Sequence, residues 1–286
     1  MAPALDMEKL VKRALGSTGL LAAPLGLGTV KWGRNSGLKH GAFEIPGDST
    51  CRDLLTMAAA AGANLLDVAP AYGQAEARLG HLLAESGTRN DWLIFTKTGE
   101  VYADGESSWD FSAAHTRRSV ENSLKALKTG FLDGVLLHCP REDLVAITDS
   151  PALEVLHAMK AEGKIRAVGV STMTLEGGLA AVPLSDLVMV SWNTDFHEHQ
   201  PVIEAAAAAG KGILLKKVLS SGNLARVPPE AEGLTPAEFR LRSALALPGN
   251  PILIAGSITP RHLEENLRAA AAGPWVGRQG GRGPDC

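Results

Sequence analysis

Short apolar segments alternate with longer segments of helical periodicity along most of the chain. The apolar segments are expected to be strands at residues 24–29, 64–69, 91–97, 132–138, 165–171, 186–192, 212–217 and 251–257. Each is followed by a stretch whose apolar positions recur at helical spacing. Strands that are almost entirely apolar are typical of a parallel sheet covered on both faces. Because eight strand–helix units close such a sheet, the pattern predicts an α/β protein with a (β/α)8 TIM barrel.

The barrel pattern accounts for the chain as one domain, residues 1–286, with the structured barrel from about 13 to 272. Before the first strand, the segment RALGSTGLLAAP has a Gly-containing turn between two short segments, which predicts a small N-terminal hairpin. Residues 273–286 are Gly-rich and are expected to form a short flexible tail.

Composition narrows the classes of function. The 286 residues hold 28 Lys and Arg against 31 Asp and Glu, a net charge of −3, so no nucleic-acid partner is expected. The three cysteines form no CxxC pair and no HExxH motif occurs, so no metal site is expected. No apolar run has bilayer length and the N-terminus lacks a secretory signal, so we expect a cytoplasmic protein without a membrane partner. The oligomeric state is left open.

Ionisable side chains stand at the ends of three consecutive predicted strands. Asp67 ends the second strand, Lys97 the third and His138 the fourth, and Tyr72 follows five residues after Asp67. The C-terminal ends of barrel strands form the active-site mouth, so these four side chains are expected to meet there. Neighbouring strands lie about 4.8 Å apart, which brings Asp67 and Lys97 within pairing distance.

Together the four side chains are typical of an acid placed over a carbonyl group. Free tyrosine titrates near pH ~10, and a neighbouring ammonium is expected to lower the pKa of Tyr72. Asp67 would hold Lys97 in place, and neutral His138 would orient a carbonyl oxygen toward Tyr72. Each residue also has a structural interpretation, as an ion pair, a hydrogen-bonded strand-end histidine or a loop cap. The chain has only two tyrosines, so one of them beside the other three residues favours the catalytic interpretation.

The same segments resemble the aldo-keto reductase family over most of the chain. LLDVAPAYGQAEARLGHLL at 65–83 is similar to the family signature D-T-A-x-x-Y-G-x-x-E-x-x-L-G, with Val68 in place of Thr. LGLGT, TK, LLHCP, GKIRAVGVS and SITPRHLEENL follow in the family's order. The resemblance implies a (β/α)8 barrel that binds NADPH without a Rossmann domain. It also implies Tyr72 as general acid, tuned by Lys97 and Asp67, with His138 positioning the carbonyl.

A cofactor site along the strand ends is a further implication of the resemblance. NADPH, with NADH as an alternative, would contact Gly28, Thr29, Asp67, Ser171, Thr172, Met189, Lys216, Leu219, Ser221, Gly256, Ser257, Ile258, His262, Glu265 and Asn266. The residues themselves indicate one phosphate site, because Thr259 and Pro260 begin a helix after the last strand and Arg261 adds positive charge. An ordinary capped helix satisfies that pattern equally well.

Several of these positions depart from the family's pattern. Thr172 and Met189 replace the Asn and Gln that hold the nicotinamide carboxamide, and Lys216 replaces an aromatic residue that stacks on the ring. Gly256 and His262 replace a phosphate-binding Lys and an Arg. These changes bear on the nicotinamide contacts and on the choice between NADPH and NADH, and they leave the four catalytic residue types intact.

NADPH-dependent reduction of aldehydes or ketones to alcohols is the function predicted, with a small-molecule carbonyl compound as the partner. The alternative is an NADP(H)-binding sensor or regulatory barrel with little turnover. The intact set of Asp67, Tyr72, Lys97 and His138 favours catalysis, whereas Met189 and Lys216 leave the alternative open. A third hypothesis is a Schiff-base enzyme with Lys97 as nucleophile. Pairing with Asp67 disfavours it, because a paired lysine stays protonated.

Overall fold

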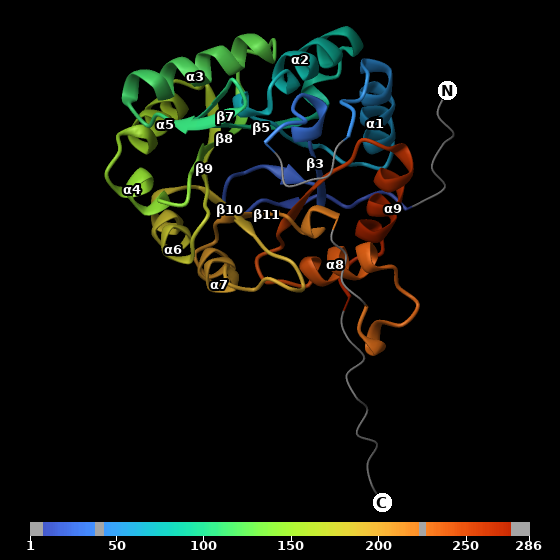
Figure 1. Ribbon diagram of the computed structural model, residues 1–286. Helices are drawn as coiled ribbons and strands as arrows, with labels where there is room; N and C mark the ends of the chain where they lie inside the picture. Colours follow the sequence, from blue (N-terminus) through green and yellow to red (C-terminus); the bar gives the residue numbers. More distant parts are fainter. Residues whose placement is uncertain (1–7, 38–42, 223–226, 276–286) are drawn as a thin grey trace, which may run out of the picture.

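Eight parallel strands close into a barrel in the part of the chain that the structure describes, residues 8–37, 43–222 and 227–275 of a computed structural model (Figure 1). The order around the ring is the order along the chain. The strands are β3 (Leu25–Gly28), β4 (Leu65–Asp67), β5 (Leu93–Thr98), β8 (Leu132–His138), β9 (Ile165–Ser171), β10 (Leu187–Ser191), β11 (Gly212–Lys216) and β12 (Ile252–Gly256). The (β/α)8 barrel predicted from the sequence is confirmed.

Helices surround the barrel and connect its strands. They are α1 (Asp48–Ala60), α2 (Ala75–Ser86), α3 (Ala113–Ala126), α4 (Asp143–Thr148), α5 (Ala152–Ala161), α6 (Leu175–Leu184), α7 (Gln200–Ala208), α8 (Pro236–Leu245) and α9 (Pro260–Ala271). Ser112, Thr174 and Thr235 cap α3, α6 and α8, because each hydroxyl accepts a backbone N–H of the first turn. Within the described ranges, none of the helices is long and apolar enough to cross a membrane.

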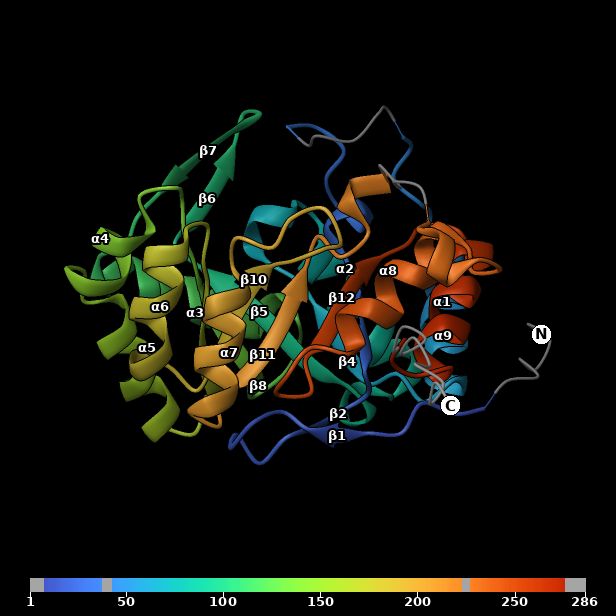
Figure 2. The ribbon, with the colours of Figure 1, turned by 90° about the horizontal axis from the view of Figure 1, so that it is seen from below.

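A short hairpin closes the N-terminal end of the barrel. It consists of β1 (Arg13–Ala14) and β2 (Leu21–Ala22), which lie below the barrel strands in Figure 2. Leu15 and Leu20 are 1% and 2% exposed and belong to the apolar cluster that fills the barrel interior. The predicted N-terminal hairpin is therefore present and plugs the barrel.

A second hairpin rises at the opposite end of the barrel, where the sequence analysis expects no strands. It pairs β6 (Glu100–Ala103) with β7 (Glu106–Trp109) and projects from the upper rim in Figure 2. Asp104 and Gly105 form its turn with φ of 53° and 88°. Asp-Gly is a favoured pair for a turn with two left-handed residues. That dipeptide was the local signal for the hairpin.

Alternation of side chains along the strands places the candidate site directly on the barrel core. Leu65, Phe95 and Leu136 are fully buried in the barrel interior. Asp67, Lys97 and His138 come two residues later on the same strands. Because residues two apart on a strand point to the same face, these three side chains cover the upper end of the interior cluster.

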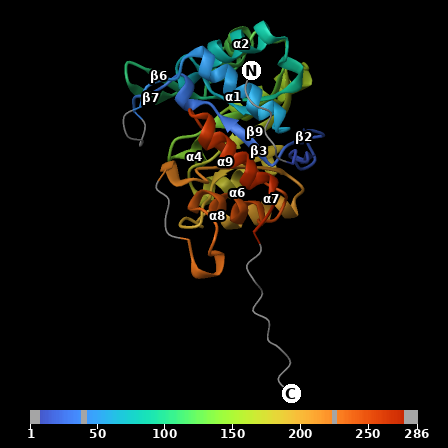
Figure 3. The same cartoon turned by 90° about the vertical axis from the view of Figure 1, so that its right-hand side faces the viewer.

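The last described residues pack against α8. Trp275 donates its backbone N–H to Arg242 O at 2.9 Å, and its ring lies 5.1 Å from that of Phe239 in an edge-to-face contact. The preceding helix, α9, contacts α8 and α1 (Figure 3). Residues 273–275 are thus docked where the sequence analysis expects a loose tail, and residues 276–286 lie outside the described residues.

Candidate active site

A buried ion pair forms the base of the candidate site. Lys97 Nζ donates to Asp67 Oδ1 at 2.5 Å and to Val68 O at 3.0 Å, and the two charged side chains are 2% and 5% exposed. Burial alone would lower the pKa of Lys97, but the attraction of Asp67 and Tyr72 outweighs it and raises that pKa. Lys97 therefore remains an ammonium at neutral pH, which disfavours its use as a Schiff-base nucleophile.

Tyr72 is held beside this pair by a short 3-10 helix, η2 (Pro70–Tyr72), that follows β4. Its ring centroid lies 4.6 Å from Lys97 Nζ. Burial raises the pKa of Tyr72 to about 12, and the opposing attraction of Lys97 does not offset it. Lys97 thus lowers the pKa of Tyr72 as the sequence predicts, but the larger effect of burial makes the net shift upward. Tyr72 is a protonated phenol at neutral pH in the described structure.

Two glycines that were not candidates let the Tyr72 loop approach the loop after β3. A Cβ added to Gly33 would lie 2.3 Å from Tyr72 O and 2.3 Å from Ala75 N. Gly73 adopts φ of 63°, and an added Cβ there would meet Gly33 O at 2.3 Å. Both positions require glycine, so the backbone contact between these loops fixes the position of the phenol.

His138 completes the group of four from the end of β8. Its ring lies 6.3 Å from that of Tyr72, nearly perpendicular at 84°. His138 Nδ1 lies 2.7 Å from Oε2 of Glu100, the first residue of β6. Burial lowers the pKa of His138, while Glu100 raises it in part. Glu100 was missed by sequence reasoning because it reaches the mouth from the unexpected hairpin.

The ends of β9 and β11 carry three of the expected cofactor residues. Lys216 Nζ donates to Ser171 Oγ at 2.9 Å and to Thr172 O at 2.8 Å, and burial lowers the pKa of Lys216 to about 7. Thr172 Oγ1 is buried without a hydrogen-bond partner among the described residues. A buried hydroxyl with free hydrogen-bonding capacity fits the carboxamide of a nicotinamide ring. Met189 instead packs in the barrel interior at 1% exposure.

The ends of β3 and β12 lie side by side, with Gly28 paired to Gly256. Thr29 Oγ1 is engaged, since it donates to Asp67 O at 2.9 Å. Ser257 Oγ donates to Thr259 O at 2.8 Å, and Trp32 Nε1 donates to Ser257 O at 3.1 Å. These bonds tie the loop after β3 to the segment that leads into α9.

The N-terminus of α9 has no capping side-chain hydrogen bond, although Thr259 stands at the cap position. Uncapped backbone N–H groups at a helix start fit a phosphate. His262 and Glu265 are exposed near this end, Glu265 pairs with Arg261 at 2.9 Å, and Asn266 is buried. The remaining expected contacts, Leu219 and Ile258, are partly buried, and the side chain of Ser221 lies outside the described residues.

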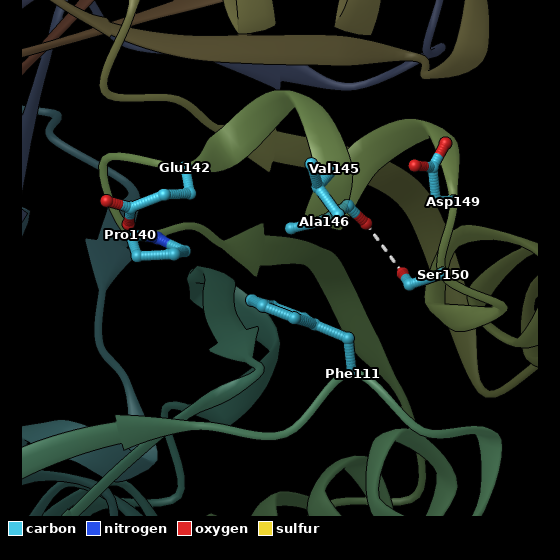
Figure 4. Close-up of a pocket in the computed structure, with 7 residues that line it drawn as sticks. All are labelled: Phe111, Pro140, Glu142, Val145, Ala146, Asp149 and Ser150. Atoms are coloured by element: carbon cyan, nitrogen blue, oxygen red, sulfur yellow. Dashed lines mark hydrogen bonds between the residues drawn. The ribbon is translucent and has the colours of Figure 1, made fainter.

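A cavity of about 330 Å³ lies beside α4, which follows β8 (Figure 4). It is lined by Phe111, Pro140, Glu142, Val145, Ala146, Asp149 and Ser150. Pro140 follows His138 by two residues, and Phe111 follows the β6–β7 hairpin. The cavity thus adjoins the segment after β8, and none of the four candidate catalytic residues is among its lining residues.

His197 and His199, after β10, have the His-x-His spacing of metal ligands, which sequence reasoning missed. His197 Nε2 lies 3.0 Å from Thr194 O, whereas His199 is 1% exposed with both ring nitrogens unpartnered among the described residues. In the same residue ranges, no group of three or more His, Cys, Asp or Glu is arranged to hold a metal ion.

Comparison with known proteins identifies the family of this barrel. The model of the aldo/keto reductase family matches residues 24–231. The chain belongs to this family. It is therefore an oxidoreductase of a family that generally binds NAD(P)H and acts on small carbonyl substrates. The family resemblance predicted from the sequence is confirmed.

Individual relatives agree with this membership. A solved structure from Pseudomonas aeruginosa, provisionally named an aldo-keto reductase, is 44% identical, with a TM-score of 0.82 over 93% of this chain and 97% of that one. The uncharacterized oxidoreductase YqkF of Bacillus subtilis is 28% identical over 91% of both chains. The aldo-keto reductase YhdN of the same organism is 34% identical over 57% of this chain, and the match spans 47% of that relative.

Proposed function

We propose that this aldo-keto reductase reduces aldehydes or ketones to alcohols with NADPH, and that Tyr72 is the general acid. The proposal rests on one observation, the convergence of Asp67, Tyr72, Lys97 and His138 at the mouth of the barrel. When bound, NADPH supplies the hydride that adds to the carbonyl carbon. The protein's part is to hold the carbonyl oxygen and to deliver a proton to it.

Tyr72 and Lys97 deliver that proton. A phenol with a pKa of about 12 stays protonated until negative charge develops on the carbonyl oxygen. The Lys97 ammonium, 4.6 Å from the phenol ring centroid, then stabilises the phenolate that remains. Asp67 fixes the ammonium in this place, because its carboxylate accepts the shortest hydrogen bond that Lys97 makes. His138 orients the carbonyl oxygen next to Tyr72.

The cofactor would lie across the ends of β9, β11, β12 and β3. Ser171 and the unpartnered hydroxyl of Thr172 would bind the carboxamide. The uncapped start of α9, with Arg261 nearby, would bind phosphate. Since Lys216 occupies Ser171 Oγ in the described structure, it has to turn away or share that hydroxyl when the cofactor binds.

NADPH oxidation with an activated aromatic aldehyde, followed by nicotinamide absorbance, tests this function. We expect steady turnover of NADPH and slower turnover of NADH, because the basic start of α9 favours the additional phosphate. Tight NADPH binding without turnover over a panel of aldehydes and ketones would contradict the proposal. It would support the sensor hypothesis instead.

A further inference from the structure

Glu100 is held against His138 by groups from two other segments. Its Oε1 accepts hydrogen bonds from Ser107 Oγ at 2.6 Å and from the Arg34 guanidinium at 3.4 Å. Arg34 also donates to Ala71 O at 3.1 Å, so it is anchored to the loop that carries Tyr72. Both contacts use Oε1, which leaves Oε2 for His138 Nδ1 at 2.7 Å. The Glu100 carboxylate, 12% exposed, is therefore fixed in place from both sides.

Of the two facing groups, His138 Nδ1 is protonated and the Glu100 carboxylate is ionised. A bare Nδ1 would repel a carboxylate oxygen 2.7 Å away, so this close contact requires a proton on Nδ1. Burial alone would raise the pKa of Glu100, but His138, Ser107 and Arg34 together lower it to about 2. Glu100 is thus ionised at neutral pH, and Nδ1 carries the proton. In the described structure the Nδ1 contact with Glu100 is an ion-pair distance and not an aligned hydrogen bond, and catalytic hydrogen bonds commonly align only with substrate bound.

A proton fixed on Nδ1 determines whether Nε2 donates or accepts a hydrogen bond. Neutral imidazole has one N–H, so with Nδ1 protonated Nε2 is an acceptor, whereas imidazolium donates from both nitrogens. A carbonyl oxygen requires a donor, and an alcohol hydroxyl offers one. Nε2 can therefore orient an alcohol when His138 is neutral and a carbonyl group only when His138 is charged. This differs from the neutral His138 that the sequence analysis expects to orient the carbonyl oxygen, because that expectation did not include a carboxylate at Nδ1.

We propose that Glu100 is a positioning residue that keeps the His138 proton on Nδ1, so that His138 binds the carbonyl substrate as an imidazolium and the alcohol as a neutral ring. The catalytic half of this inference rests on the proposed function. Its protonation half does not, because it concerns two residues in contact in the free protein.

The pH dependence follows from the groups that face His138. Burial lowers the pKa of His138, Glu100 from β6 raises it in part, and Lys97 from β5 and Lys216 from β11 lower it further. Tyr72 from η2 faces the ring as an uncharged phenol at these pH values. Carbonyl binding through Nε2–H is therefore present at acid pH and is lost as the pH rises through the lowered pKa of His138.

Nitrogen NMR of the His138 ring tests the protonation half without cofactor. In the wild type we expect the neutral ring to carry its proton on Nδ1, with Nε2 bare. Glutamine offers both a donor and an acceptor, so in Glu100→Gln we expect the tautomer to shift toward Nε2–H and the pKa of His138 to fall. Glu106→Gln is the control, because Glu106 is an exposed residue of the same hairpin. Nε2–H in the neutral wild-type ring would overturn the proposal, whether or not the variant folds.

Kinetics test the catalytic half. In the wild type, kcat/KM for carbonyl reduction should fall about tenfold per pH unit above the pKa of His138. In Glu100→Gln it should be about tenfold lower at acid pH and nearly independent of pH, with NADPH affinity unchanged. A variant with normal turnover and the wild-type pH profile would overturn the proposal. If neither protein reduces carbonyl compounds, the proposed function fails, and the NMR result still decides the protonation of His138.

Discussion

Removal of the carboxylate from the buried ion pair should destabilise the barrel strongly. Asp67→Asn removes the negative charge beside the Lys97 ammonium, which is 2% exposed, and leaves it only neutral acceptors, the new amide oxygen and Val68 O at 3.0 Å. Loss of one partner from a buried pair costs about 3–5 kcal/mol. Lys97 can limit this cost by losing its proton, which at pH 7 requires about 4.6 kcal/mol from an ordinary lysine pKa of about 10.4. We therefore expect a loss of about 3–5 kcal/mol in the free energy of unfolding.

The double variant distinguishes an uncompensated charge from lost packing. Asp67→Asn with Lys97→Met removes both charges, so its loss should be smaller than that of either single variant. The coupling between the two substitutions should reach about 3 kcal/mol. Urea unfolding at pH 7 measures each free energy, after a test for two-state behaviour.

An exposed ion pair provides the control for this measurement. Arg52 Nη2 lies 2.7 Å from Glu85 Oε2, and the two side chains are 48% and 52% exposed. Glu85→Gln should leave stability unchanged within error, because water solvates the remaining charge. If Asp67→Asn were equally harmless, or if the single losses of Asp67 and Lys97 simply added, the electrostatic reasoning would be refuted.

Three further predictions concern other contacts of the barrel. Gly33→Ala should displace Tyr72, because the new Cβ would lie 2.3 Å from its carbonyl oxygen, and should reduce kcat by tenfold or more in addition to a loss of about 1–3 kcal/mol in stability. Normal kcat in the folded variant would contradict this. Gly80→Ala places a Cβ 2.2 Å from a backbone oxygen of α3 and should cost about 1–3 kcal/mol by urea unfolding, whereas Gly130→Ala, with open space, should cost much less. Burial lowers the pKa of Lys216 to about 7, so between pH 7 and about 10.4 the unfolded chain binds one more proton than the folded one. The cost of burying Lys216 is therefore greatest below pH 7 and declines as the pH rises. Lys216→Met should gain most stability over the wild type below pH 7, and a pH-independent difference would contradict the shift.

The barrel was predictable because each of its strands appears in the sequence as a short apolar run. A strand buried on both faces is a short apolar run, and the end of each run marks the mouth. Asp67, Lys97 and His138 each end or nearly end such a run, so their meeting needed only the barrel geometry. The β6–β7 hairpin gave a weaker signal, because its residues are polar or partly exposed and only Asp104-Gly105 marks its turn.

What the sequence could not supply depends on contacts between distant segments. Glu100 reaches His138 across the mouth, and no spacing along the chain indicates that contact. The sign of the pKa shift of Tyr72 depends on how far burial outweighs Lys97, which is a property of the packed site. The bond from Lys216 to Ser171 likewise joins two strand ends whose separation in the sequence carries no such information.

Turnover of Tyr72→Phe beside the wild type tests the central claim most directly. Both proteins would be assayed for NADPH oxidation with the same aldehyde, and NADPH affinity would be measured by fluorescence titration. Because the substitution removes one hydroxyl from the proposed acid, kcat should fall by about 10² or more while NADPH affinity stays within a factor of two. If Tyr72→Phe reduced the aldehyde as fast as the wild type, Tyr72 would not be the proton donor.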